Sequence, residues 1–145
     1  MTRQVVLVTG PPCAGKSHYV RTHAKPDDTV LCIDTLAQRL GSPVAHNHSG
    51  SMYGNAEKQY WDLANRIARH PTVCAWIIRC APEPEERLYL VRGVRATRCV
   101  VMLPTMQVAM ARAIRRGADA AVTLTAIRSW YRRYQPASFD EVVSS

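Results

Sequence analysis

A glycine-containing segment near the start of the chain constrains the fold more than any other feature of the sequence. The apolar run at residues 5–8 leads into Gly10-Pro11-Pro12-Cys13-Ala14-Gly15-Lys16-Ser17, and a helical pattern follows over residues 17–24. This order of strand, loop with the pattern Gly-x4-Gly-Lys-Ser, and helix is typical of a loop that wraps around the phosphates of a nucleotide. Glycine permits the unusual backbone angles of such a loop and leaves space for a phosphate. The sequence therefore predicts a nucleotide-binding site here.

The residues of this loop have distinct predicted roles. Pro11 and Pro12 lack an N–H group, so the backbone donors are expected from residues 13–17. The Lys16 ammonium can reach the β- and γ-phosphates, and the Ser17 hydroxyl can ligate Mg²⁺. The N-terminus of the following helix adds a partial positive charge. We expect ATP or another nucleoside triphosphate to be bound by Gly10, Cys13, Ala14, Gly15, Lys16, Ser17 and His18.

Four apolar runs rich in β-branched residues predict strands over residues 4–9, 29–33, 72–79 and 98–103. Helical patterns lie over residues 17–24, 36–40, 57–69, 83–95, 106–116 and 122–134. Continuously hydrophobic runs indicate parallel strands that are buried on both faces. Strands that alternate with helices predict an α/β fold of three layers, with a short, mainly parallel sheet of about four or five strands. Thr105 is a predicted helix N-cap, and Gly117 is expected to end the same helix.

Length and composition bound the organisation of the chain. Its 145 residues suit one domain, which we place at residues 1–136, followed by a loosely ordered terminus at 137–145. Residues 41–55 are rich in Ser, Gly, His and Asn and are expected to form a mobile loop beside the site. No apolar stretch is long enough for a membrane span, and no signal peptide is recognisable, so a cytoplasmic location is expected. The five cysteines include no Cys-x2-Cys pair, which favours free thiols over a disulfide or a zinc site.

The chain is strongly basic, with 16 arginines and three lysines against 11 acidic residues. Arginine binds phosphate groups in a bidentate manner, which favours an anionic substrate such as nucleic acid. A GC-rich genome would also encode arginine in place of lysine. Both interpretations are open at this point.

Other features of the sequence exclude several classes of nucleotide-binding protein that carry such a loop. Motor ATPases and helicases need a longer chain and a strand that ends in acidic residues, whereas the predicted third strand ends in Arg79. The Asn-Lys-x-Asp motif by which GTPases recognise guanine is absent from the sequence. A small phosphotransferase remains.

Asp34 follows the second predicted strand, at the edge of a parallel sheet where ligands bind. A carboxylate there can accept the proton of an attacking hydroxyl or hold the metal through water. The alternative is that Asp34 caps a short helix. Arg112, Arg115 and Arg116 lie near one face of the helix predicted over residues 106–116. They are candidates for a lid that closes over the donor, and the alternative is a solvated basic face.

Arg79 at the end of the third strand is a candidate ligand for a phosphate of the donor or the acceptor. The alternative is an ion pair with one of the nearby acidic residues Glu83, Glu85 and Glu86. The aromatic residues Tyr53, Tyr60 and Trp61 flank the expected loop and could stack on a base, although core packing is the favoured interpretation of Trp61.

The chain resembles small P-loop kinases of the polynucleotide-kinase and AAA_33-like type over residues 4–134, most specifically at Gly10–Ser17. The resemblance implies a nucleoside- or nucleotide-kinase-like P-loop NTPase fold, with Asp34 as the activator of the acceptor hydroxyl. It also implies acceptor binding by Arg39 and a lid that carries Arg112, Arg115 and Arg116. The segment 126–134 is similar to small kinases of phages that infect actinobacteria, some of which are thought to phosphorylate hydroxymethyluracil in DNA. Relatives of polynucleotide kinase often carry an Asp where this chain has Arg79.

These observations favour an ATP- and Mg²⁺-dependent kinase that acts on a hydroxyl of a nucleic acid or nucleotide. The expected catalytic residues are Lys16, Asp34, Arg112 and Arg116, and the expected acceptor-binding residues are Asp34, Arg39 and Arg79. A kinase of a small metabolite is the alternative enzyme. A nucleotide-binding accessory protein with little turnover is the alternative from another class.

Overall fold

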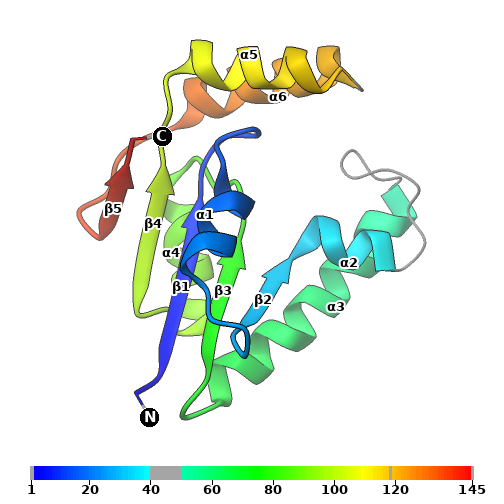
Figure 1. The fold of residues 1–145 in the computed structure, drawn as a ribbon. Helices are drawn as coiled ribbons and strands as arrows, with labels where there is room; N and C mark the ends of the chain where they lie inside the picture. The colour runs from blue at the N-terminus through cyan, green and yellow to red at the C-terminus, as the bar shows by residue number, and fades with distance from the viewer. Residues whose placement is uncertain (1, 40–49, 118, 145) are drawn as a thin grey trace.

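The computed structural model describes residues 2–39, 50–117 and 119–144, with side chains from residue 54 onward in the second range. Strands and helices alternate through most of this part of the chain (Figure 1). The strands are β1 (Gln4–Thr9), β2 (Thr29–Cys32), β3 (Cys74–Ile78), β4 (Arg98–Met102) and β5 (Asp140–Val143). The helices are α1 (Lys16–His23), α2 (Ile33–Arg39), α3 (Gly50–Arg69), α4 (Pro84–Val94), α5 (Met106–Arg116) and α6 (Ala120–Arg133).

The described strands form one parallel sheet in the order β2-β3-β1-β4-β5. In its centre, Val8 of β1 is in register with Ile78 of β3 and with Val100 of β4. Because all strands are parallel, their carboxyl ends meet at one edge of the sheet, where ligands of such folds bind. The predicted α/β class with a parallel sheet flanked by helices is confirmed.

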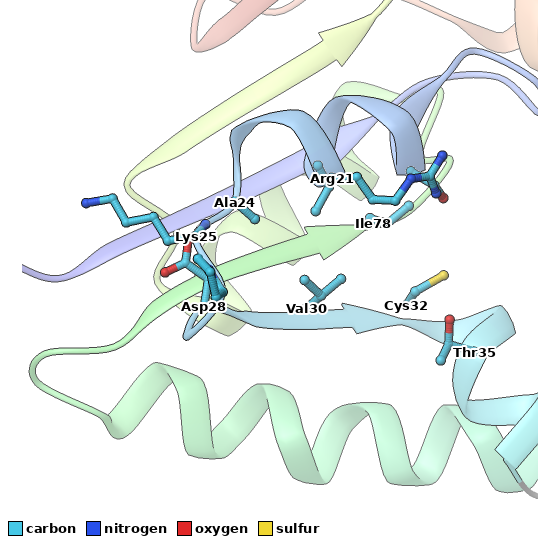
Figure 2. A pocket seen from close by; sticks show the side chains of 11 residues that line it. Arg21, Ala24, Lys25, Asp28, Val30, Cys32, Thr35 and Ile78 are labelled. Atoms are coloured by element: carbon cyan, nitrogen blue, oxygen red, sulfur yellow. The ribbon is translucent and has the colours of Figure 1, made fainter.

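The two faces of the sheet are covered unequally. Helices α2, α3 and α4 pack on one face, around buried residues that include Leu7 and Ile77. On the other face, Val20 of α1 packs in a cluster with Val8 and Ile78. Val30 of the edge strand β2 lies on the α1 side but stays 49% exposed (Figure 2). This face therefore leaves part of β2 open to solvent.

Most predicted elements are present, with boundary shifts of a few residues. The limits predicted for β1 and α5 are confirmed, and the Thr105 hydroxyl accepts a hydrogen bond from the Val108 N–H at 3.2 Å, as expected of an N-cap. Gly117 is the C-cap of α5. The expected loop over residues 41–55 is wrong at its end, because α3 already begins at Gly50 and its next residues are helical. Residues 41–49 lie outside the described part.

Helices α5 and α6 form an antiparallel pair that crosses the end of the molecule toward which β1 and β4 point (Figure 1). Ala109, Ala113 and Ile127 form the buried centre of this pair. Cys13, in the glycine loop after β1, packs against the same cluster. The pair therefore sits directly on the glycine loop.

The expectation of a loosely ordered terminus is wrong for residues 140–143, which form β5 and pair with β4. Only two of the four residues of this strand are hydrophobic, so its composition does not indicate a strand. Its position is fixed instead by a charged side chain from elsewhere. Asp140 forms a bidentate ion pair with Arg87 of α4, at 3.0 and 2.8 Å.

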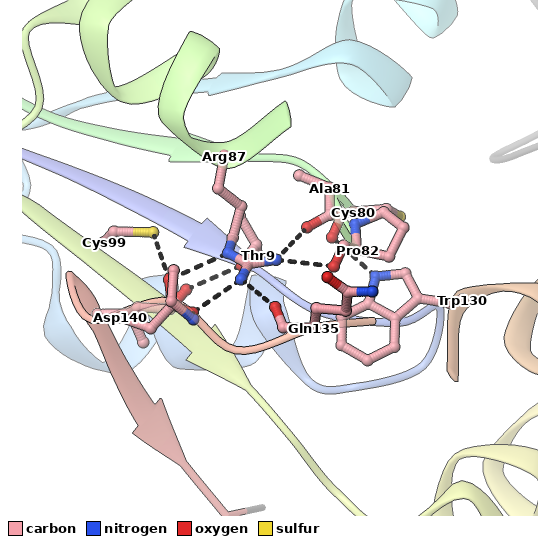
Figure 3. A network of polar contacts seen from close by, with 11 residues as sticks. Thr9, Cys80, Ala81, Pro82, Arg87, Cys99, Trp130, Gln135 and Asp140 are labelled. Carbon is pink, nitrogen blue, oxygen red and sulfur yellow. Dashed lines mark hydrogen bonds and ion pairs between the residues drawn. The ribbon is translucent and has the colours of Figure 1, made fainter. Parts of the chain in front are cut away.

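The Arg87 side chain is fully buried, and its guanidinium binds three parts of the chain (Figure 3). It donates to the carbonyls of Ala81 and Pro82 at 3.1 and 2.8 Å and to the carbonyl of Gln135 at 2.6 Å. With the Asp140 carboxylate, these acceptors satisfy a charge that would otherwise be expensive to bury. The β3–α4 connection, the end of α6 and β5 are thus held together at one point.

A second arginine joins the ends of two helices. Arg3 donates to the carbonyls of Ile67 and His70 at the end of α3, at 3.2 and 3.1 Å. It also donates to the carbonyls of Val94, at 2.7 Å, and Arg95 at the end of α4. A cation at a helix C-terminus satisfies free carbonyls and interacts favourably with the helix dipole.

All five cysteines are free thiols. Cys99 of β4 is buried beside Asp140, and burial raises the pKa of its thiol to about 12. Cys80, in contrast, is exposed in the β3–α4 connection.

Replacing Asp140 tests the role of the buried ion pair. Asp140→Ala leaves the Arg87 charge buried without its carboxylate and should lower the free energy of unfolding by about 3–5 kcal/mol. The matched control is Glu141→Ala on the same strand, whose partner Arg98 is 47% exposed, and its effect should stay below about 1 kcal/mol. Equilibrium urea unfolding measures both. Equal losses would show that the buried pair does not hold β5, and Asp140→Asn provides the comparison if the alanine variant does not fold.

Candidate functional site

The glycine loop between β1 and α1 has the backbone that the sequence predicts for a phosphate-binding loop. Gly10 has a φ of 149°, and a Cβ there would lie 2.6 Å from the Met102 carbonyl oxygen. Gly15 has a φ of 91°, and Cys13 has a φ of 63°. These left-handed conformations turn the chain around a small space in front of α1. Glycine is required at position 10 by both the angle and the contact.

The backbone donors of this loop lie mainly at the start of α1. The Tyr19 N–H makes the first bond of the helix, to the Gly15 carbonyl at 2.9 Å, so the amides of Lys16, Ser17 and His18 have no partner within the helix. The Ala14 N–H is donated to the Pro11 carbonyl at 3.2 Å, inside the loop itself. The donors that suit a phosphate are thus concentrated in the first helical turn, at the positive end of the helix dipole.

Lys16 extends back over the loop. Its ammonium donates to the carbonyls of Gly10 and Pro11 at 2.8 and 2.9 Å and lies 3.5 Å from the Cys80 sulfur. The ammonium therefore lies across the mouth of the loop, where a phosphate would replace the two carbonyls as its partner. The Ser17 hydroxyl lies exposed in the same helical turn.

Arg112, one of the three candidate lid arginines, contacts the loop. Its guanidinium donates to the Cys13 carbonyl at 3.1 Å, and one of its nitrogens is the nearest atom to a Cβ built on Gly15, at 3.9 Å. Arg115 and Arg116 lie exposed in the last turn of α5. Of these three arginines, Arg112 therefore lies at the candidate nucleotide site.

Asp34 lies half-buried in the first turn of α2, immediately after β2. Because α2 begins at Ile33, Asp34 lies within the first turn of the helix rather than directly before it. Thr35, the next residue, and Ser17 of α1 both line one surface groove. The start of α2 therefore faces the helix that begins at the glycine loop. Arg39 is exposed in the last turn of α2.

Arg79 is engaged in a structural contact that the sequence did not identify. Its guanidinium pairs with Glu57 of α3 at 2.9 Å and lies 4.7 Å from the centre of the Tyr60 ring. The alternative of an ion pair is confirmed, but its partner is Glu57 and not Glu83, Glu85 or Glu86. Tyr60 is fully buried, which rules out stacking on a base, and burial raises the pKa of its hydroxyl to about 12.

The residue missed by sequence analysis at this site is Cys80, whose carbonyl joins the loop to the helices above it. This carbonyl accepts from the Gly10 N–H at 3.2 Å and from the Trp130 indole N–H of α6 at 2.8 Å. No motif marks a backbone acceptor, so the sequence carries no signal for it.

The residues present fit a nucleoside triphosphate with Mg²⁺. Free amides in the first turn of α1, the Lys16 ammonium and Arg112 offer donors and positive charge around one small space. Mg²⁺ is usually held by one or two protein ligands together with substrate phosphates, and the exposed Ser17 hydroxyl can serve as such a ligand. Among the described residues, no cluster of three or more His, Cys, Asp or Glu side chains could hold a metal by itself.

Comparison with solved structures shows that the chain is similar in fold to proteins that include kinases. A chain of the Pnkp1/Rnl/Hen1 RNA repair complex superimposes with a TM-score of 0.69 at 12% identity, covering 92% of this chain and 47% of that chain. A gluconokinase from Sinorhizobium meliloti 1021 superimposes with a TM-score of 0.64 at 13% identity, covering 98% and 82%. A tunicamycin resistance protein from Deinococcus radiodurans gives 0.64 at 13%, covering 97% and 85%.

The sequence by itself matches no protein-family model and no curated protein. None of the helices in the described ranges is both long and apolar enough to cross a membrane.

The glycine loop is tested by adding a single methyl group. Gly10→Ala introduces a contact with backbone at an angle that alanine rarely adopts, and should lower the free energy of unfolding by about 1–3 kcal/mol. Gly54→Ala in α3 is the control, because a Cβ there meets nothing within 4 Å and alanine favours a helix by about 0.5–1 kcal/mol. Thermal unfolding of both variants decides. Equal stability of the two variants would contradict the described loop.

Proposed function

We propose that this protein is a kinase that uses ATP and Mg²⁺ to phosphorylate a hydroxyl of a nucleic acid or nucleotide. The observation that carries the proposal is the convergence of two helix starts at the carboxyl edge of the sheet. Ser17, at the start of α1, and Thr35, beside Asp34 at the start of α2, line one groove. Such a placement suits a donor phosphate on one side and an acceptor hydroxyl on the other.

The side chains have complementary roles in this proposal. Bound ATP would supply the phosphoryl group, with Mg²⁺ neutralising charge on its oxygens. The Lys16 ammonium would bind phosphate oxygens in place of the Gly10 and Pro11 carbonyls, and the Ser17 hydroxyl would hold the metal. Arg112 adds positive charge from the lid. The Asp34 carboxylate accepts the proton of the attacking hydroxyl, so no covalent intermediate on the protein is needed.

A polynucleotide is the proposed acceptor, either through a 5′-hydroxyl or through hydroxymethyluracil in DNA. The likeness in fold to a chain of an RNA repair complex and the excess of arginine support this choice. Arg39 is exposed at the end of α2 and is available to an acceptor, whereas Arg79 would have to exchange its Glu57 contact. We place Arg115 and Arg116 at the edge of the donor site. A cytoplasmic location in a bacterial or phage-infected cell belongs to the same proposal.

A small-metabolite kinase is the second candidate. The gluconokinase and the tunicamycin resistance protein match this chain over most of their own length, which favours this alternative in fold and size. A nucleotide-binding accessory protein with little turnover is the third candidate. It differs from the other two in that it would bind ATP without transferring phosphate to an acceptor.

The deciding experiment measures transfer of labelled γ-phosphate from ATP to a panel of acceptors. The panel contains 5′-hydroxyl oligonucleotides, DNA with hydroxymethyluracil, nucleosides, nucleotides and sugar acids. Label should appear on nucleic acid and disappear with Lys16→Ala. Label on a sugar acid alone would favour the metabolite kinase, and no label with retained ATP binding would favour the accessory protein.

Asp34→Ala tests the proposed base. Loss of the carboxylate should lower kcat by about 10²–10⁴-fold, because proton transfer in the transition state is no longer assisted. ATP binding, measured by calorimetry, should remain. Gln38→Ala, an exposed position on the same helix, is the matched control and should behave as wild type. Unchanged kcat in Asp34→Ala would remove this residue from the mechanism.

A further inference from the structure

A groove runs along α1 from the candidate site toward the opposite edge of the sheet. Its volume is about 520 Å³, within the range of sites that bind ligands. Ser17 and Thr35 line it near the carboxyl edge, and Pro26 and Asp28 line it in the connection that leads into β2. The groove exists because one short helix leaves this side of the edge strand partly uncovered.

The lining of the groove changes in character along its length. Val20, Val30 and Ile78 contribute apolar surface, and Val30 stays 49% exposed there. Arg21 lies on α1, and Lys25 lies two residues beyond the end of this helix at His23. Figure 2 shows the Arg21 side chain extending toward the end where Cys32 and Thr35 lie, whereas Lys25 extends away from the other end. Positive charge therefore stands at both ends of an apolar stretch.

The charged side chains that line this groove differ in whether they already have hydrogen-bond partners. Asp28 accepts from the Lys25 N–H and from the Trp76 indole N–H, both at 2.9 Å, and these hydrogen bonds lower the pKa of its carboxyl. These hydrogen bonds hold the Asp28 carboxylate in the wall of the groove. In the described part of the chain, the exposed Arg21 guanidinium makes no hydrogen bond or ion pair.

We propose that this groove binds the acceptor strand: the sugar-phosphate chain that follows the reacting nucleotide lies along α1, with phosphates at Arg21 and Lys25. This inference rests on the proposed function. The seven helical residues from Ser17 to His23 span about 10 Å, and Lys25 follows two residues beyond. A stacked strand carries one phosphate for about 3.4 Å of its length, so about three nucleotides fit. A small metabolite would fill only the end beside Ser17 and would leave Lys25 without a role.

Length dependence distinguishes a strand from a compact acceptor. The double variant Arg21→Ala/Lys25→Ala should raise KM about 10-fold for a 5′-hydroxyl octanucleotide and leave KM for a nucleoside, which carries no phosphate, within about twofold of wild type. Arg66→Ala is the matched control, because Arg66 is exposed on α3, which packs on the other face of the sheet. Equal KM increases for both acceptors would contradict a strand in the groove.

Binding without turnover gives an independent readout. Anisotropy of a labelled octanucleotide, measured from about 50 to about 200 mM salt, reports the number of phosphate contacts, at about 0.7 in the logarithmic slope for each contact with a single strand. The double variant should lose about 1.4 from this slope, and Arg66→Ala should lose none. An unchanged slope overturns the groove even if kinase activity on nucleic acid is found. If no acceptor is phosphorylated, the proposed kinase fails, and loss of the slope in the double variant still supports the groove.

Discussion

The buried ion pair between Arg87 and Asp140 is the contact on which the candidate site depends. Arg87 also holds the carbonyls of Ala81 and Pro82, which directly follow Cys80. The Cys80 carbonyl in turn accepts from the loop and from α6, and its thiol lies beside Lys16. A charge buried inside the protein is tolerated only where its partners are fixed, so the network holds this connection in one conformation. The β3–α4 connection, which forms one wall of the candidate nucleotide site, is therefore held in place by an ion pair that lies outside the site.

The limits of sequence analysis follow from the range of each interaction. The glycine loop, β1 and the Thr105 cap depend on residues within a few positions of each other, and their patterns were sufficient to predict them. The pair Arg87–Asp140 joins residues 53 positions apart, and neither side chain lies in a motif. Strand β5 was missed for the same reason, because its place beside β4 depends on this pair more than on its own composition.

The candidate site shows the same division. The position of Asp34 at the carboxyl edge could be predicted, since it follows from the order of strand and helix alone. The partner of Arg79 could not, because Glu57 and Tyr60 reach the end of β3 only through the tertiary packing of α3, which no local pattern indicates. The sequence alone does not show whether an arginine at the end of a strand stabilises the fold or binds a ligand. The residues that pack around it in the folded protein determine this, here Glu57 and the buried Tyr60.

Helix α1 links the two anion-binding features that we infer. Its first turn presents amides and Lys16 to the loop, Arg21 on its flank lines the groove, and Lys25 lines the groove just beyond the end of the helix. A donor triphosphate and an acceptor strand are both anionic, so they repel each other unless cations stand close to each of them. The net charge of +8 cannot provide this by itself, because salt screens exposed charges beyond about 10 Å. The positions of Arg112 above the loop and Arg21 beside Ser17 therefore matter more than the total charge, and both are set by packing around one buried residue of α1, Val20, and the lid helix above it.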